Sequence, residues 1–165
     1  MKRLNLYIKG LILLVFLAIN SLFSYSQERE RFLDFNYITI SDNKEYNLYS
    51  ISTDYTLVYF YSPECEECTK LKKKLSKNKI LNKLINEKQI TILAILPDVE
   101  KEYWLDKAEF IPKHWINSWN QNDGIIIKTY LKTLPTLFIL DKDKYIIGSF
   151  HEEKPLFDWI KTKAH

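Results

Sequence analysis

The most constraining feature of this chain of 165 residues is an apolar run that leads into a closely spaced pair of cysteines. The run Thr56–Tyr61 is followed by a proline and then by Cys65 and Cys68, the only two cysteines in the sequence. Such a run is typical of a strand that is buried on both faces. Leucines recur at helical spacing after Cys68. The sequence therefore predicts a strand that delivers a Cys-x-x-Cys pair to the first turn of a helix, which is a redox arrangement.

The position of the pair predicts a division of roles. Cys65 is expected at or just before the helix N-terminus, where unpaired backbone N–H groups and the helix dipole favour a thiolate. Cys68 lies one turn later and is expected to be more buried. Cys65 would attack a disulfide of a partner protein, and Cys68 would resolve the mixed disulfide. The alternative is an inert structural disulfide, but closing so short a loop stabilises a fold little. No bound cofactor is expected, because the cysteine pair itself holds the electrons.

Two acidic residues lie between the cysteines. Glu66 and Glu67 suit the positive end of a helix dipole, but they oppose a neighbouring thiolate, and Lys70 and Lys72 compensate only in part. A less stabilised thiolate means a less stable reduced form and a more reducing couple. We therefore expect a reductant rather than a strong oxidant.

A zinc site is the other interpretation of Cys-x-x-Cys. A structural zinc ion needs four ligands, and the chain has only two cysteines. His114, His151 and His165 have no ligand spacing near the pair and are expected to be ordinary surface residues. No metal site is predicted.

Residues 1–26 have the pattern of a secretory signal peptide. Lys2 and Arg3 precede the apolar run Leu11–Ile19, and Ser24-Tyr25-Ser26 offers a small-x-small cleavage site. The apolar run is shorter than the roughly 20 residues of a bilayer span. We expect an exported, periplasmic protein, with an uncleaved N-terminal anchor facing the periplasm as the alternative. Disulfides persist in that compartment.

The net charge of the chain bears on its possible partners. The formal charge is +3, but the three basic residues of the signal are not balanced by any acid. The remaining chain carries 21 basic and 21 acidic residues. This gives no reason to expect nucleic acid or an anionic membrane as the partner. The composition, 46% hydrophobic and 27% charged, fits one globular domain, which we place at residues 35–165 after a loose polar lead-in at residues 27–34.

Hydrophobic spacing predicts alternating strands and helices along this domain. The predicted strands are Phe35–Ile40 at an edge, Glu45–Ile51, Thr56–Tyr61, Ile90–Leu96, Thr136–Leu140 and Tyr145–Phe150. One helix is predicted to begin at Cys65 and to extend or restart at residues 80–85. A second includes Tyr103 and Trp104, and a third covers Pro155–Lys163. Gly124–Leu131 fits a helix or a strand, and Trp115 and Trp119 fall in a connection. This order predicts an α/β fold, a mixed sheet covered by helices on both faces.

At this point the residues resemble a known family. The strand that ends in Cys65-Glu-Glu-Cys68, the segment Leu134-Pro135-Thr136 about seventy residues later, and the Asp141–Lys144 turn with its hairpin are similar to exported TlpA/ResA-like thioredoxins of bacterial envelopes. The resemblance covers roughly residues 35–163. It implies a three-layer thioredoxin fold and a thiol–disulfide oxidoreductase.

The resemblance also implies further site residues. Pro135 is expected to be cis and to pack beside the disulfide, the backbone of Leu134 to pair with a substrate strand, and Thr136 to help position the site. Without the resemblance, a trans proline would be the default. Glu64 and Trp104 are candidates for a docking groove near Cys65, and core packing is the alternative for the tryptophan.

Three positions depart from the family pattern. Glu64 stands where a tryptophan usually precedes the first cysteine, Tyr59 where many members bury an acid, and Lys73 where many have a helix proline. The fold prediction survives these changes, whereas proton transfer and substrate do not carry over.

The predicted function is disulfide exchange with envelope proteins. The expected partners are protein thiols and disulfides, with electrons received from a membrane donor, and we expect a monomer. Two alternatives stay open: a binding module without catalysis, and a thiol peroxidase. A peroxidase would need an arginine near its cysteine, and no arginine follows Arg31.

Overall fold

The computed structural model describes residues 29–97, 99–120 and 124–163. Within these residues one sheet of 7 strands has the order β2-β1-β5-β4-β3-β6-β7. The strands are β1 (Asn36–Thr39), β2 (Glu45–Asn47), β3 (Tyr55–Phe60), β4 (Ile90–Ile95), β5 (Ile116–Trp119), β6 (Thr136–Asp141) and β7 (Ile146–Phe150). The helices are α2 (Glu66–Lys77), α3 (Lys79–Asn86), α4 (Lys101–Asp106), α5 (Gly124–Tyr130) and α6 (Glu153–Thr162), with 3₁₀ turns η1 (Leu48–Ser50) and η2 (Ala108–Phe110).

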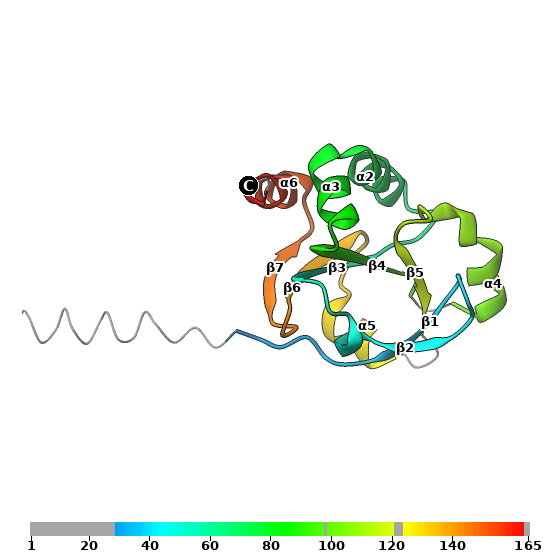
Figure 1. Ribbon diagram of the computed structural model, residues 1–165. Helices are drawn as coiled ribbons and strands as arrows, with labels where there is room; N and C mark the ends of the chain where they lie inside the picture. Colours follow the sequence, from blue (N-terminus) through cyan, green and yellow to red (C-terminus); the bar gives the residue numbers. More distant parts are fainter. Residues whose placement is uncertain (1–28, 98, 121–123, 164–165) are drawn as a thin grey trace, which may run out of the picture.

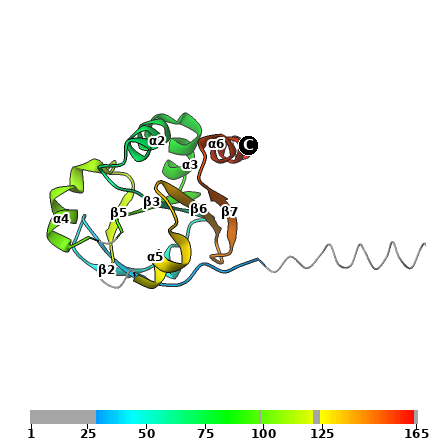
Figure 2. The same cartoon turned by 180° about the vertical axis from the view of Figure 1, so that it is seen from behind.

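The sheet is the middle of three layers. Helices α2, α3 and α6 cover one face, and α5 lies on the other (Figures 1 and 2). Leu71, Leu75 and Leu156 of the first group belong to the core cluster on their face, whereas Ile126 and Tyr130 of α5 belong to the second cluster. Helices on both faces of a mixed sheet confirm the predicted α/β thioredoxin fold.

Strand β3 lies at the centre of this architecture. It runs parallel to β4 and antiparallel to β6 along its whole length. Val58, Tyr59 and Phe60 are fully buried, because both faces of the strand are covered by a helical layer. The predicted central strand is confirmed, and its carboxyl end leads directly to the two cysteines.

Several predictions were wrong for the side of the sheet that is formed by β2, β1 and β5. Strand β1 is not an edge strand, because β2 and β5 pair with its two sides. The second strand ends at Asn47, whose side chain accepts a hydrogen bond from the backbone N–H of Tyr49 and caps the turn η1. Residues Ile116–Trp119 form strand β5 rather than a connection. The polar pair Asn117 and Ser118 hides this strand in the sequence, yet both side chains are buried and hydrogen-bonded.

The segment before the domain is packed rather than loose. Phe32 is fully buried and stacks on Tyr130, with ring centroids 4.0 Å apart. Its backbone N–H donates to the carbonyl of Lys144, and Arg31 bridges to Tyr145 beside β7. The Phe32 side chain is part of the core between the sheet and α5. The folded domain therefore starts before the predicted residue 35.

The predicted signal peptide lies outside the described residues. Among residues 29–97, 99–120 and 124–163, no helix has the length and apolar character needed to cross a membrane.

Candidate redox site

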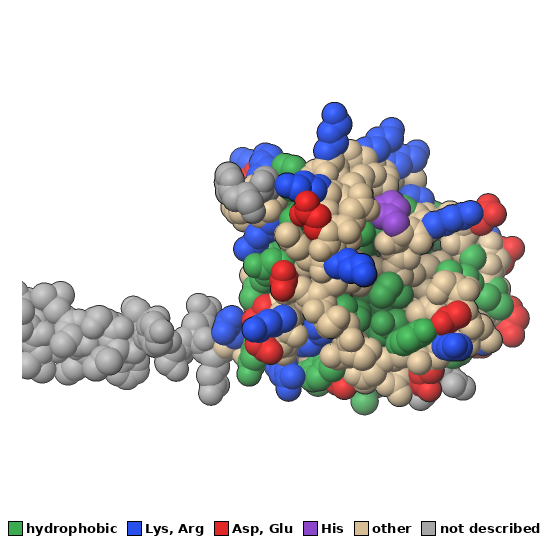
Figure 3. Space-filling view, in the orientation of Figure 1, with side chains coloured by type: hydrophobic (Ala, Val, Ile, Leu, Met, Phe, Trp, Pro, Cys, Tyr) green, Lys and Arg blue, Asp and Glu red, His purple; other side chains and the backbone are tan. Residues whose placement is uncertain are grey.

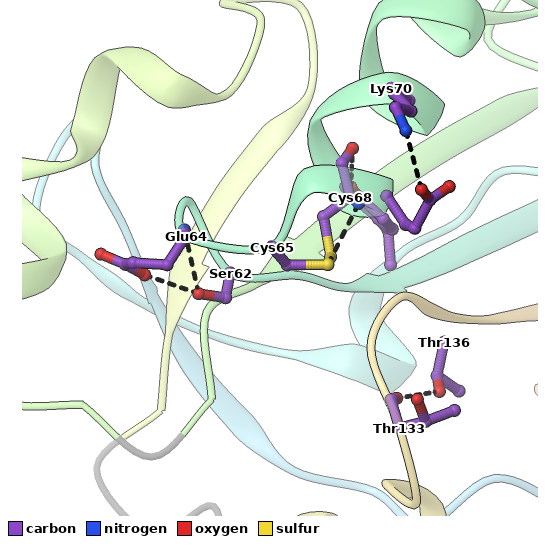
Figure 4. Close-up of a disulfide and its surroundings, with 9 residues drawn as sticks. Ser62, Glu64, Cys65, Cys68, Lys70, Thr133 and Thr136 are labelled. Carbon is purple, nitrogen blue, oxygen red and sulfur yellow. Dashed lines mark hydrogen bonds and ion pairs between the residues drawn. A yellow bond between two sulfur atoms is a disulfide. The ribbon is translucent and has the colours of Figure 1, made fainter.

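Cys65 and Cys68 form a disulfide at the start of α2. Their Cα atoms are 5.2 Å apart, and Cys65 is the N-cap residue of the helix. The Cys65 Sγ atom accepts a hydrogen bond of 3.1 Å from the backbone N–H of Cys68 (Figure 4). This is one of the N–H groups that a helix leaves without an internal partner, so the cap geometry favours negative charge on the Cys65 sulfur.

The two cysteines differ in exposure. Cys65 is partly exposed, whereas Cys68 is fully buried. The hydroxyl of Tyr59, near the carboxyl end of β3, donates a hydrogen bond of 2.9 Å to the backbone carbonyl of Cys68. A partner disulfide can therefore reach only the first sulfur, while the second is held inside by a bond between the strand and the helix.

The loop before β6 lies beside the pair. The Leu134–Pro135 peptide bond is cis, and Thr136 pairs with Phe60 in the sheet. This register brings residues 133–135 next to the residues that follow β3. The buried hydroxyl of Thr136 donates to the carbonyl of Thr133 at 2.6 Å and fixes the loop (Figure 4).

The acidic side chains near the pair have different partners. The amine of Lys70 binds both Glu66 and Glu67 at 2.9 Å. This bond lowers the pKa of the Glu66 carboxyl and raises the pKa of the Lys70 amine. Lys72 does not join them: its amine donates to the carbonyl of Phe110 at 2.7 Å and lies over the ring of that residue.

Glu64, immediately before Cys65, is held by a separate set of bonds. The Ser62 hydroxyl donates to its carboxylate at 2.6 Å, and the Tyr103 hydroxyl donates to the other carboxylate oxygen. The bond from Ser62 is the main reason that the pKa of Glu64 lies below its ordinary value. Tyr103 comes from α4, and no spacing rule relates it to Glu64 in the sequence.

A buried polar network lies behind the site. Asn117 of β5 accepts hydrogen bonds from the indole N–H of Trp104 at 2.9 Å and from the hydroxyl of Tyr61 at 3.3 Å. Its amide donates to the carbonyl of Ala108 at 3.0 Å. Trp104 is fully buried, so its predicted place in a docking groove was wrong and the core alternative holds. Sequence reasoning missed Asn117, since a lone asparagine gives no burial signal.

The buried tyrosines of the sheet predict a loss of stability at alkaline pH. Burial raises the pKa of Tyr37 to about 12 and that of Tyr59 and Tyr61 further. The unfolded chain releases these protons near pH 10, and the folded chain keeps them. The contribution of these phenols to the free energy of unfolding is therefore fully present below about pH 10. Above that pH the free energy of unfolding falls by about 1.4 kcal/mol per pH unit for each of the three phenols.

Denaturant unfolding at a series of pH values above about 9, with tyrosinate absorbance as the second signal, checks this prediction. Tyr59→Phe should reduce the slope, because one phenol with a raised pKa is removed. Burial lowers the pKa of Lys144, so this amine contributes in the opposite direction only up to about pH 10.5. Equal stability at pH 10 and pH 11 would contradict the assignment.

A second concavity lies away from the cysteines. A cleft of about 950 Å³ is lined by residues of β1 and β2 and by residues 108–117. Figure 3 shows hydrophobic side chains in a hollow of this face. The residues that precede β5 line this cleft, whereas the cysteines follow β3. Strands β3 and β5 both run parallel to β4, so the two strands point in the same direction. The part of the cleft formed by residues 111–115 is therefore at the opposite end of the strands from the redox pair.

The two histidines among the described residues have different surroundings. His114 lines the cleft of about 950 Å³, and the Nδ1 atom of His151 lies 3.4 Å from the hydroxyl oxygen of Thr136. His165 lies outside the described residues. Among the residues that the structure describes, no group of three or more His, Cys, Asp or Glu side chains could hold a metal ion.

Comparison with known proteins identifies a family for this chain. A family profile described as thioredoxin-like matches residues 53–146. A search of curated proteins gave no match.

Solved structures with the same fold include proteins of the genus Bacteroides. The chain is similar to a thioredoxin-like protein from Bacteroides caccae, with 30% identity and a TM-score of 0.72 over 79% of this chain and 47% of that one. It thus spans about half the length of that relative. A conserved protein of unknown function from Bacteroides fragilis has 28% identity and a TM-score of 0.73, over 82% and 99% of the two chains. A thiol:disulfide interchange protein from Bacteroides sp. has 19% identity and a TM-score of 0.64, over 81% and 88%, and shares the fold.

Proposed function

The chain belongs to the thioredoxin-like family, and on that premise we propose that it is a thiol–disulfide oxidoreductase acting on proteins outside the cytoplasm. One observation carries the proposal. Cys65 caps a helix and is partly exposed, while Cys68 is fully buried one turn later. An exposed attacking sulfur with a buried resolving sulfur is what disulfide exchange requires.

The reaction begins from the reduced pair. The Cys65 thiolate attacks one sulfur of a client disulfide, and a mixed disulfide forms as the first client thiolate leaves and takes a proton from water. The Cys68 thiol then loses its proton and attacks the Cys65 sulfur, so that the second client thiolate leaves. Two electrons pass to the client, and Cys65–Cys68 becomes the disulfide seen here. A dithiol donor must reduce it again.

The client is proposed to lie along the loop before β6. The cis bond at Leu134–Pro135 and the pairing of Thr136 with Phe60 place this loop beside the carboxyl end of β3. The backbone of Leu134 would then pair with an extended client segment, in the manner of strand addition. The dithiol donor is proposed to be a membrane protein, in keeping with the export signal predicted for residues 1–26.

The charges near the pair favour a reductant. Lys70 offsets two carboxylates, and Lys72 is engaged with Phe110, so neither amine is left to pair with a thiolate on Cys65. Glu64 adds a further negative charge beside Cys65. A thiolate in such surroundings is less stable than one beside a free cation, and the reduced form is correspondingly less stable.

The reduction potential tests both the activity and its direction. Equilibration of the purified protein with dithiol–disulfide buffers of graded potential, followed by counting of thiols, should give a two-electron transition more negative than about −200 mV. A potential near −120 mV, typical of strong oxidants, would overturn the direction. A pair that never titrates would favour the binding module instead.

A further inference from the structure

One of the three carboxylates around the cysteines has no lysine partner. Glu66 and Glu67 share the amine of Lys70, whereas no ion pair involves Glu64 among the residues that the structure describes. Lys107, whose amine lies over the ring of Tyr103, is paired with Asp106 at 2.7 Å. Among the residues that the structure describes, Glu64 is therefore the carboxylate near the cysteines that takes part in no ion pair, whereas Glu66 and Glu67 keep one net negative charge after their shared bond to Lys70.

This charge is fixed in place rather than swinging freely. Ser62 donates to one carboxylate oxygen and Tyr103 to the other, so the side chain is held from both β3 and α4 sides. Figure 4 shows Glu64 and Lys70 on opposite sides of the cysteine pair. The backbone N–H of Glu64 also donates to the Ser62 hydroxyl, which closes a tight local turn before Cys65.

The position of Glu64 matters because it directly precedes the attacking cysteine. A client that brings a disulfide to the partly exposed Cys65 also meets the turn of residues 62–64 that carries this carboxylate. The carboxylate is itself exposed, so a client side chain can reach it.

We infer that Glu64 is a specificity-determining residue, which favours client disulfides flanked by lysine or arginine and disfavours those flanked by aspartate or glutamate. The inference rests on the proposed function, since it concerns the clients of the same site. Tyr103 acts as a positioning residue, which holds the carboxylate in one place beside the turn that leads to Cys65. A single charge in water-exposed surroundings should raise the exchange rate of a positively charged client about threefold and lower that of a negatively charged client about threefold. The two rates should therefore differ about tenfold.

The test uses three disulfide-linked model peptides that differ only in the residue beside the cysteine: lysine, glutamine or aspartate. The rate constant for attack by the reduced full-length protein is measured for each at low salt and at about 1 M salt. The expected ratio of lysine to aspartate peptide is about tenfold at low salt, and it should approach one at high salt.

Variants locate the effect. Glu64→Gln should lower the ratio of the lysine to the aspartate peptide, and Tyr103→Phe should lower it by less while the net charge is unchanged. Glu87→Gln is the matched control, because it removes the same charge at the far end of α3, next to the start of β4. It should leave the ratio as in the natural chain.

The outcomes separate the inference from the function it rests on. If the natural chain attacks all three peptides at one rate, or if Glu87→Gln lowers the ratio as much as Glu64→Gln, the inference is overturned and the proposed oxidoreductase stands. If the reduced chain attacks none of the peptides, the proposed function itself fails. Tyr103→Phe and the salt dependence of the natural chain keep the test decisive if Glu64→Gln does not fold.

Discussion

Cys68→Ser is expected to accumulate mixed disulfides with client proteins in the cell envelope. The variant keeps Cys65 and its position at the N-cap of α2, so the first attack still occurs. It lacks the second sulfur, so the mixed disulfide cannot be resolved from within the protein. Serine is close to cysteine in size, and the bond from Tyr59 goes to the backbone carbonyl of residue 68, so the fold should be retained. Non-reducing gel electrophoresis followed by identification of the trapped proteins measures the result.

Cys65→Ser is the matched control. It removes the partly exposed sulfur and leaves the fully buried one, which a client cannot reach. No mixed disulfide should form, so the two variants should differ in an all-or-none way. Equal trapping by both variants would show that the assigned order of attack is wrong. No trapping by either would support the non-catalytic binding module.

Asn117→Ala should destabilise the domain by about 3–5 kcal/mol. The substitution leaves two buried groups, the indole N–H of Trp104 and the hydroxyl of Tyr61, and the partly buried carbonyl of Ala108 without this partner. Each buried polar group that loses its bond costs about 1–3 kcal/mol. Denaturant unfolding measured as a change in midpoint at constant slope gives the value.

Ser118→Ala provides the comparison on the same strand. Ser118 is also fully buried, but its hydroxyl makes a single bond, donated to the carbonyl of Ala94 at 2.9 Å. Its loss should cost about 1 kcal/mol. If the two variants were equally stable, the network around Asn117 would not be the element that ties α4 and the turn η2 to the sheet.

Much of the fold could be predicted because its signals are local. An uninterrupted apolar run marks β3, and the change to helical spacing marks α2, since each pattern reflects which face of the element meets the core. Strand β5 escaped because Asn117 and Ser118 interrupt its hydrophobic pattern, and their burial depends on partners elsewhere in the chain. Phe32 escaped for the same reason: its pocket is formed by Tyr130 and the hairpin at Lys144.

The candidate site divides in the same way. The sequence by itself determined the chemistry, because Cys65 and Cys68 are the only two cysteines and their spacing at a strand–helix junction is a local property. Only the tertiary structure decided the electrostatics around them. Lys70 binds both acids between the cysteines, Lys72 turns to Phe110, and Tyr103 fixes Glu64. The partners that α4 and η2 contribute come from about forty residues along the chain, and no local pattern encodes which polar groups meet when those elements pack together.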